Sequence, residues 1–123
     1  MRIPTPKESQ EQATVFEWAK IQSKSIPELE LMYHVPNGGS RNKIEAARLK
    51  AQGVKAGVPD ICLPVARNGC HGLYIELKRV GGAKPRENQL EWLEKLMRQG
   101  YKVAVCYGAE AAIKEITDYL KGE

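Results

Sequence analysis

The sequence predicts a single α/β domain, residues 1–123, in which helices cover both faces of a mixed β-sheet. Two apolar segments, 60–66 and 72–80, are joined by the turn-forming stretch Arg67-Asn68-Gly69, which predicts an antiparallel β-hairpin. A helical pattern over 85–99 then connects this hairpin to one further apolar strand, and such a crossover makes neighbouring strands parallel. The predicted element order is therefore α-β-α-β-β-α-β-α.

The N-terminal half is predicted to contain a helix, a short strand and a second helix. Thr5-Pro6 resembles an N-cap with proline at the first helical position, and Gly53 is a typical stop for the second helix. The loop Pro36-Asn37-Gly38-Gly39-Ser40 separates the strand from the second helix. The predicted ranges are 7–25 for the first helix, 29–35 for the strand and 42–52 for the second helix.

The C-terminal half adds the hairpin, the crossover helix, a strand and a last helix over 109–120. Pro59 stands at the entry of the first hairpin strand, where a missing N–H is tolerated. The continuous apolar run 101–107 predicts a buried strand. Trp92 is expected in the core rather than as a stacking surface for bases. The predicted apolar stripes of the last two helices are Leu90, Leu93, Leu96, Met97, Ala112, Ile113, Ile116 and Leu120.

The composition is that of a globular, modestly basic protein. The chain has 19 Lys and Arg against 15 Asp and Glu, a net charge of +4, and no apolar run approaches the length of a membrane span. Its start lacks the apolar core of a signal peptide, and its three cysteines form no CxxC pair. We therefore expect a cytoplasmic protein with reduced, buried thiols. A basic cluster precedes the motif GVPD and suits either a solvated helix face or a nucleic-acid contact; it comprises Arg41, Lys43, Arg48, Lys50 and Lys55.

Three charged residues interrupt the apolar hairpin strands. Asp60 begins the first strand, whereas Glu76 and Lys78 lie two apart in the second and so point to one side of the sheet. Hairpin pairing can bring the carboxylates of Asp60 and Glu76 together, and such an oxygen-rich pair suits Mg²⁺ or Mn²⁺. A carbonyl oxygen of Ile75 or Leu77 can add a ligand. Singly, Asp60 can cap a turn and Glu76 with Lys78 can form a surface ion pair, but together, at this spacing and with the flanking motifs, they predict a metal site. A metal-activated water with Lys78 beside it would suit phosphodiester hydrolysis.

The chain resembles the VRR-NUC family of the PD-(D/E)xK nuclease superfamily. Pro59-Asp60 followed by Glu76-Leu77-Lys78 is similar to the superfamily signature, which alone is weak. The surrounding motifs are more specific to the family, and the similarity extends from the first helix to the last strand. These motifs are YHVPNGGSR over 33–41, GVKAGVPD over 53–60, YIELK over 74–78 and QLEW over 89–92.

The resemblance implies a restriction-endonuclease-like fold and a divalent-metal nuclease that acts on DNA. Asp60 and Glu76 would be metal ligands together with the Leu77 carbonyl, Lys78 would be the catalytic lysine, and Gln89 would be a further site residue. A glutamate of the first helix usually completes the acidic cluster in the family. Glu8 matches the family's Glu-x-x-x-Gln opening best, with Glu11 and Glu17 as the alternatives.

The expected partner is DNA, which we expect to be branched. The loop Asn37-Gly38-Gly39 is either a tight turn or a backbone cradle for a phosphate that Arg41 clamps. Further candidate phosphate contacts are Lys43, Lys55, Lys84 and Arg86. Short members of the family, mostly from phages and bacteria, resemble Holliday-junction resolvases, which implies a homodimer. The alternatives are a nicking or restriction-type nuclease on duplex or flap DNA, and an inert nucleic-acid-binding module.

Overall fold

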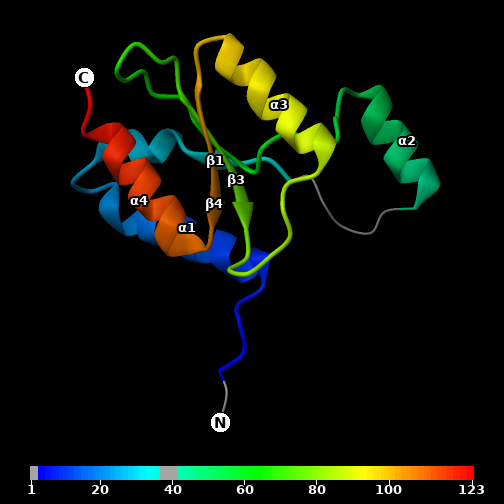
Figure 1. Cartoon of the computed structure of the whole chain (residues 1–123), viewed down its shortest axis with the longest axis horizontal. Coiled ribbons are helices and arrows are strands. Elements are labelled where there is room, and N and C mark those ends of the chain that lie inside the picture. Colours follow the sequence, from blue (N-terminus) through cyan, green and yellow to red (C-terminus); the bar gives the residue numbers. More distant parts are fainter. Residues whose placement is uncertain (1–2, 37–41) are drawn as a thin grey trace.

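The structure is a computed structural model that describes residues 3–36 and 42–123, and its sheet has the order β1-β2-β3-β4 (Figure 1). No helix in this described part of the chain combines the length and apolarity needed to cross a bilayer. The elements are α1 (Glu8–Gln22), the 3₁₀ helix η1 (Pro27–Leu31), β1 (Tyr33–His34), α2 (Lys43–Ala51), β2 (Ile61–Leu63), β3 (Leu73–Lys78), α3 (Glu87–Arg98), β4 (Lys102–Tyr107) and α4 (Ala109–Leu120).

The sheet is mixed, as the sequence predicts. β2 pairs antiparallel with both β1 and β3, and the β2–β3 pair is the predicted hairpin. β3 and β4 run parallel because α3 carries the chain across the sheet between them. Figure 1 shows α1 and α4 on one side of the sheet and α3 on the other, which confirms that helices cover both faces.

Successive side chains of β3 point alternately into the hydrophobic core and toward a polar face of the sheet. Leu73, Ile75 and Leu77 are almost fully buried and belong to the hydrophobic cluster that α1 and α4 complete. Burial of each such side chain stabilises the fold by about 1.5–3 kcal/mol. The intervening residues of β3 face α3 instead. The same strand therefore anchors the core and presents Glu76 and Lys78 on its other side.

The predicted strand over 29–35 is mostly wrong. Its first residues belong to η1, and only Tyr33 and His34 pair with β2. Pro27 starts the 3₁₀ turn, and an ion pair of 2.6 Å between Glu28 and Arg67 ties that turn to the loop between β2 and β3. A local sequence pattern cannot predict contacts between residues so far apart in the chain. β2 is also shorter than predicted and ends before Pro64, which lacks the N–H that a ladder needs.

The predicted stripe of α3 is only partly buried. Leu93 is buried, but Leu90 and Met97 are 50% and 56% exposed. α2 lies where predicted, and the Asn42 side chain caps it by accepting a 2.7 Å hydrogen bond from the Glu45 N–H. However, α2 buries none of its residues, and Ile44 is 83% exposed.

Candidate active site

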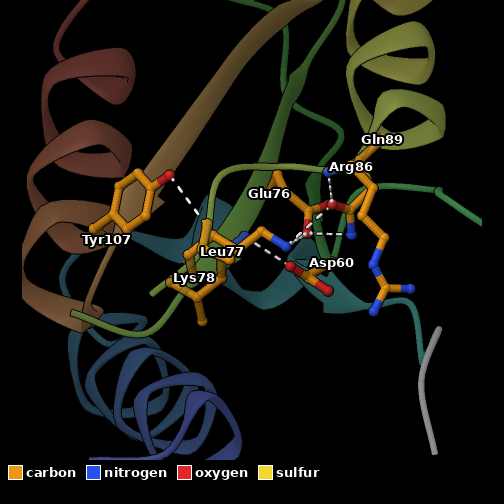
Figure 2. Close-up of polar contacts among 8 residues, drawn as sticks. Asp60, Glu76, Leu77, Lys78, Arg86, Gln89 and Tyr107 are labelled. Carbon is orange, nitrogen blue, oxygen red and sulfur yellow. Dashed lines mark hydrogen bonds and ion pairs between the residues drawn. The ribbon is translucent and has the colours of Figure 1, made fainter. Parts of the chain in front are cut away.

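Two buried carboxyl groups lie opposite each other where β2 and β3 meet α3 (Figure 2). Asp60 immediately precedes β2, and the pairing of Ile61 with Ile75 places Asp60 opposite Glu76. The two residues are only 8% and 1% exposed. The Leu77 N–H donates a 2.7 Å hydrogen bond to Asp60 Oδ2, so the backbone of β3 fixes the orientation of the Asp60 carboxyl.

Lys78 and Gln89 close the site on its α3 side. Lys78 Nζ lies 3.1 Å from Gln89 Oε1 and 3.5 Å from Glu76 Oε2, while Gln89 Nε2 donates to Glu76 Oε2 over 3.1 Å. The Arg86 N–H also donates to Gln89 Oε1 over 2.8 Å, which holds the amide in the first turn of α3. Gln89 therefore receives two hydrogen bonds and donates one, and so it fixes the ammonium group against the carboxylate (Figure 2).

The carboxyl pair is electrostatically unfavourable as two anions. Burial, followed by the nearby charge of Asp60, raises the pKa of Glu76 to about 8, although Lys78 opposes this shift. Burial also raises the pKa of Asp60, against the lowering effect of its hydrogen bond from the Leu77 N–H. Glu76 Oε1 is buried and accepts no hydrogen bond from any residue in the described ranges 3–36 and 42–123. A buried acceptor without a partner costs about 1–3 kcal/mol, so the site favours a bound proton or a bound cation.

The raised pKa of Glu76 predicts that the metal-free protein loses stability as the pH rises. A carboxyl group whose folded pKa exceeds its unfolded pKa stabilises the fold below the unfolded value, near 4.5, and loses that contribution as the pH passes about 8. The melting temperature in chelator should therefore fall between pH 5.5 and 8.5, and Glu76→Gln should flatten this dependence. An equally steep dependence in Glu76→Gln would assign the effect to other groups.

The three glutamates of α1 that sequence analysis left open occupy different environments. Burial and then the charge of Asp60 raise the pKa of Glu8, whereas Lys78 lowers it, so Glu8 lies within electrostatic reach of both residues. Glu11 is buried instead against the start of α4, where its Oε2 lies 2.9 Å from the position that a Cβ on Gly108 would take. Glu17 is exposed. The pKa of Glu8 therefore responds to both Asp60 and Lys78, and the role that the family resemblance implies for Glu8 stays a prediction.

The donor set fits a hard divalent cation. In the described ranges, no three His, Cys, Asp or Glu side chains gather tightly enough to form a ready-made metal cluster. Two carboxyl groups nevertheless converge, and one of their buried oxygens lacks a hydrogen-bond partner in that part of the chain. Mg²⁺ and Mn²⁺ are bound through few carboxylates with water completing the shell, so a pair of this kind is sufficient.

The described candidate nucleic-acid residues lie on two separate segments of the chain. Lys43 and Lys55 are exposed on α2 and on the loop that follows it, and Lys84 and Arg86 are exposed on the loop between β3 and α3. The predictions for Asn37, Gly38 and Arg41 fall outside the described residues. His34, which the sequence left open, contributes Nδ1 at 2.9 Å from the Asp60 carbonyl oxygen, and this contact joins β1 to the start of β2.

Gly57 is a residue whose importance sequence analysis did not identify. Its φ is +88°, and a Cβ at this position would lie 3.0 Å from the Asn88 carbonyl oxygen in the first turn of α3. Trp92 adds a hydrogen bond of 3.1 Å from Nε1 to the Ala56 carbonyl oxygen. The loop before Asp60 is therefore seated on the turn of α3 that carries Gln89. The glycine of the GVPD motif is a sequence signal for a backbone with special requirements. The sequence does not show that Asn88 is the residue it contacts.

Gly57→Ala should therefore disturb the site more than Gly53→Ala does. Both glycines have positive φ values, but a Cβ at Gly53 would meet nothing within 4 Å. Backbone strain alone costs about 1–3 kcal/mol, and only Gly57→Ala adds a clash with α3. Chemical denaturation should show the larger loss in Gly57→Ala. Equal losses in the two variants would show that the close approach to Asn88 is unimportant.

Comparisons with known proteins agree with this geometry. The family model of the VRR-NUC domain matches residues 6–110. A solved structure titled "VRR_NUC domain protein" is 35% identical in sequence, with a TM-score of 0.83, over 97% of this chain and 92% of that one. No curated protein matches the chain.

Proposed function

This chain belongs to the VRR-NUC domain family of PD-(D/E)xK-type nucleases, and we propose that it is a divalent-metal-dependent DNA endonuclease that acts on branched DNA as a homodimer. The observation that carries the proposal is the buried pair of Asp60 and Glu76, with an acceptor oxygen that has no hydrogen-bond partner among the described residues. A protein that only bound nucleic acid would gain nothing from two buried carboxyl groups facing a polyanion.

The proposed metal ligands are Asp60, Glu76 and the Leu77 carbonyl oxygen, with Glu8 at the edge of the site. A bound Mg²⁺ or Mn²⁺ would lower the pKa of a water molecule and offset negative charge on the phosphate. Burial serves this role because charge–charge interactions are stronger where water is excluded. The raised pKa of Glu76 means that the carboxyl must lose its proton before it can bind a cation, so metal affinity should increase with pH.

Lys78 is the proposed catalytic cation. Its ammonium group, held by Gln89 and Glu76, can donate hydrogen bonds to the attacking water and to a phosphate oxygen, on which negative charge accumulates. In the reaction the water oxygen bonds to phosphorus and the bond to one sugar oxygen breaks. The water gives up a proton to solvent, and the departing sugar oxygen takes one up. Gln89 is a positioning residue, because it acts through Lys78 and Glu76.

Branched DNA and a homodimer are the finer parts of the proposal. Each chain has one site, and cutting two opposed strands of a four-way junction requires two sites related by two-fold symmetry. The main rival is a nicking or restriction-type enzyme that acts on linear duplex or flap DNA. Both activities would use the same carboxyl pair and lysine, so substrate preference has to be measured.

Side-by-side cleavage of labelled four-way junction, flap, splayed-arm and linear duplex DNA separates these possibilities. We expect paired cuts in opposite strands of the junction in Mg²⁺ or Mn²⁺, and a dimer by sedimentation. Preferential cutting of flap or linear DNA, or a monomer, would remove the resolvase assignment and keep the nuclease. Binding of all four substrates without cutting, in either metal, would favour the inert binding module.

A further inference from the structure

α2 stands beside the domain rather than packing into it. None of its residues is buried, and Figure 1 shows it apart from the sheet, near the N-terminal end of α3. In a globular domain most helical stability comes from packing one apolar face, so an unpacked short helix with apolar residues requires another explanation.

A groove of about 610 Å³ lies between α2 and the body of the domain. Its volume falls in the range of small-molecule sites, and its walls are largely apolar with a single charged side chain. The residues that form most of the wall are Val35, Pro36, Leu49, Val54, Lys55 and Trp92.

Three residues that line the groove connect it to the active site. The Val35 N–H donates a 2.7 Å hydrogen bond to the Asp60 carbonyl oxygen, and Val58, another lining residue, lies two residues before Asp60. On α3, Trp92 lies about one turn beyond Gln89. A ligand in the groove would therefore be a close neighbour of a phosphate held at the carboxyl pair.

Trp92 gives the groove a fixed aromatic wall. The hydrogen bond from its Nε1 to the Ala56 carbonyl oxygen restrains the ring, and the residue is not part of the hydrophobic cluster, contrary to the core position predicted from the sequence. Restrained aromatic rings are the usual stacking surfaces for unpaired bases, since every base offers a π-face.

The charge around the groove is positive. The segment from 43 to 55 contains one acidic residue, Glu45, against four basic residues. All four basic residues are exposed, and they are Lys43, Arg48, Lys50 and Lys55. An apolar partner protein would not need these four basic residues, whereas they would attract a phosphate backbone that runs along α2.

We propose that this groove takes up an unpaired base adjacent to the scissile phosphate, while the basic face of α2 contacts the neighbouring phosphates. The inference rests on the proposed nuclease function and adds the feature of DNA that the enzyme recognises. A base inside a regular duplex is stacked and paired, so it cannot enter the groove. A base at a bulge, a mismatch or a branch point is released at little cost.

The test uses Lys78→Ala protein, which should cut bound DNA far more slowly than the wild type, and two duplexes with the same number of base pairs that differ by one unpaired adenine. We expect the bulged duplex to bind about 5-fold to 100-fold tighter, the range that stacking of one base on an aromatic ring provides. Trp92→Ala and the groove-filling Val54→Trp, each added to Lys78→Ala, should bring this ratio close to one. Lys50→Ala should weaken binding of both duplexes similarly.

Ile44→Trp is the matched control, since it adds the same side chain to an exposed position of α2 outside the groove and should keep the ratio. Equal binding of the two duplexes, or a ratio that survives Val54→Trp, would overturn the inference. A change of oligomeric state in Val54→Trp but not in Ile44→Trp would also overturn it, by assigning the groove to a second copy of the chain. Wild-type protein tests the nuclease activity separately. Cleavage without a preference for bulged DNA would refute base binding in the groove and leave the proposed nuclease function standing. Bulge-selective binding without cleavage would support base binding in the groove and refute the nuclease function.

Discussion

Asp60→Asn is expected to lower metal-dependent DNA cleavage by about a thousandfold or more and to raise the melting temperature of the metal-free protein. The rate falls because the substitution removes one of the two carboxylates proposed to hold the metal. The melting temperature rises because the same change removes repulsion between two buried carboxyl groups, whose pKa values are both raised.

The geometry explains why asparagine should be tolerated. Its carbonyl oxygen can still accept the hydrogen bond from the Leu77 N–H. Its amide can donate to Glu76 Oε1, which no other described residue contacts by a hydrogen bond. A gain of about 1 kcal/mol would raise the melting temperature of a chain of this size by about 3–5 °C. The gain should be largest above pH 8, where both carboxyl groups of the wild-type pair are ionised.

Thermal melts in chelator, Mg²⁺ and Mn²⁺ measure this effect. Metal should stabilise the wild type and have little effect on Asp60→Asn. Asp118→Asn is the matched control, because that carboxylate forms an exposed ion pair with Lys114 and its replacement should leave both melting and cleavage nearly unchanged. An Asp60→Asn protein that melts lower than the wild type, or that cuts normally, would remove Asp60 from the proposed site.

Lys78→Ala should reduce cleavage by about a hundredfold to ten-thousandfold while DNA binding remains within a few fold. The loss has two causes. The ammonium group that would stabilise the phosphate oxygens disappears. The pKa of Glu76, which Lys78 lowers, should rise further, so that more of the protein carries a protonated carboxyl at neutral pH.

These two causes can be separated by pH. Raising the pH to about 9 should restore metal binding to Lys78→Ala, as measured by titration calorimetry, without restoring the cleavage rate. Lys114→Ala is the control, since it removes an exposed lysine with an acidic partner of its own four residues away. Full recovery of cleavage at high pH would show that Lys78 only tunes Glu76 and does not act on the phosphate.

The hairpin and its charged residues were predictable because they depend on local rules. Alternation in β3 fixed the side to which Glu76 and Lys78 point, and antiparallel pairing placed Asp60 opposite Glu76. Gln89 was different, because its role came through the family resemblance alone. Its hydrogen bonds to Lys78 and Glu76 join a helix to a strand, and such contacts follow from the three-dimensional fold rather than from periodicity.

What the sequence could not reveal depends on packing between distant segments. The residues around Leu29 have the sequence pattern of a strand. In the structure Leu29 lies in the 3₁₀ helix that Pro27 begins and that the Glu28–Arg67 ion pair holds to the loop after β2. The apolar positions of α2 suggest a buried face but do not say whether anything covers it. Trp92 looks like a core residue for the same reason, whereas in the structure it lines an open groove beside the active site.

The most direct test of the central claim is cleavage of end-labelled DNA by wild-type protein as a function of Mg²⁺ or Mn²⁺ concentration. Chelator provides the blank, and protein carrying Asp60→Asn and Lys78→Ala together controls for a contaminating nuclease. We predict cleavage that is absent in chelator, saturates with metal and is lost in the double variant. Cleavage that persists in chelator, or equal cleavage by the double variant, would contradict a metal-dependent nuclease built on the Asp60–Glu76 pair.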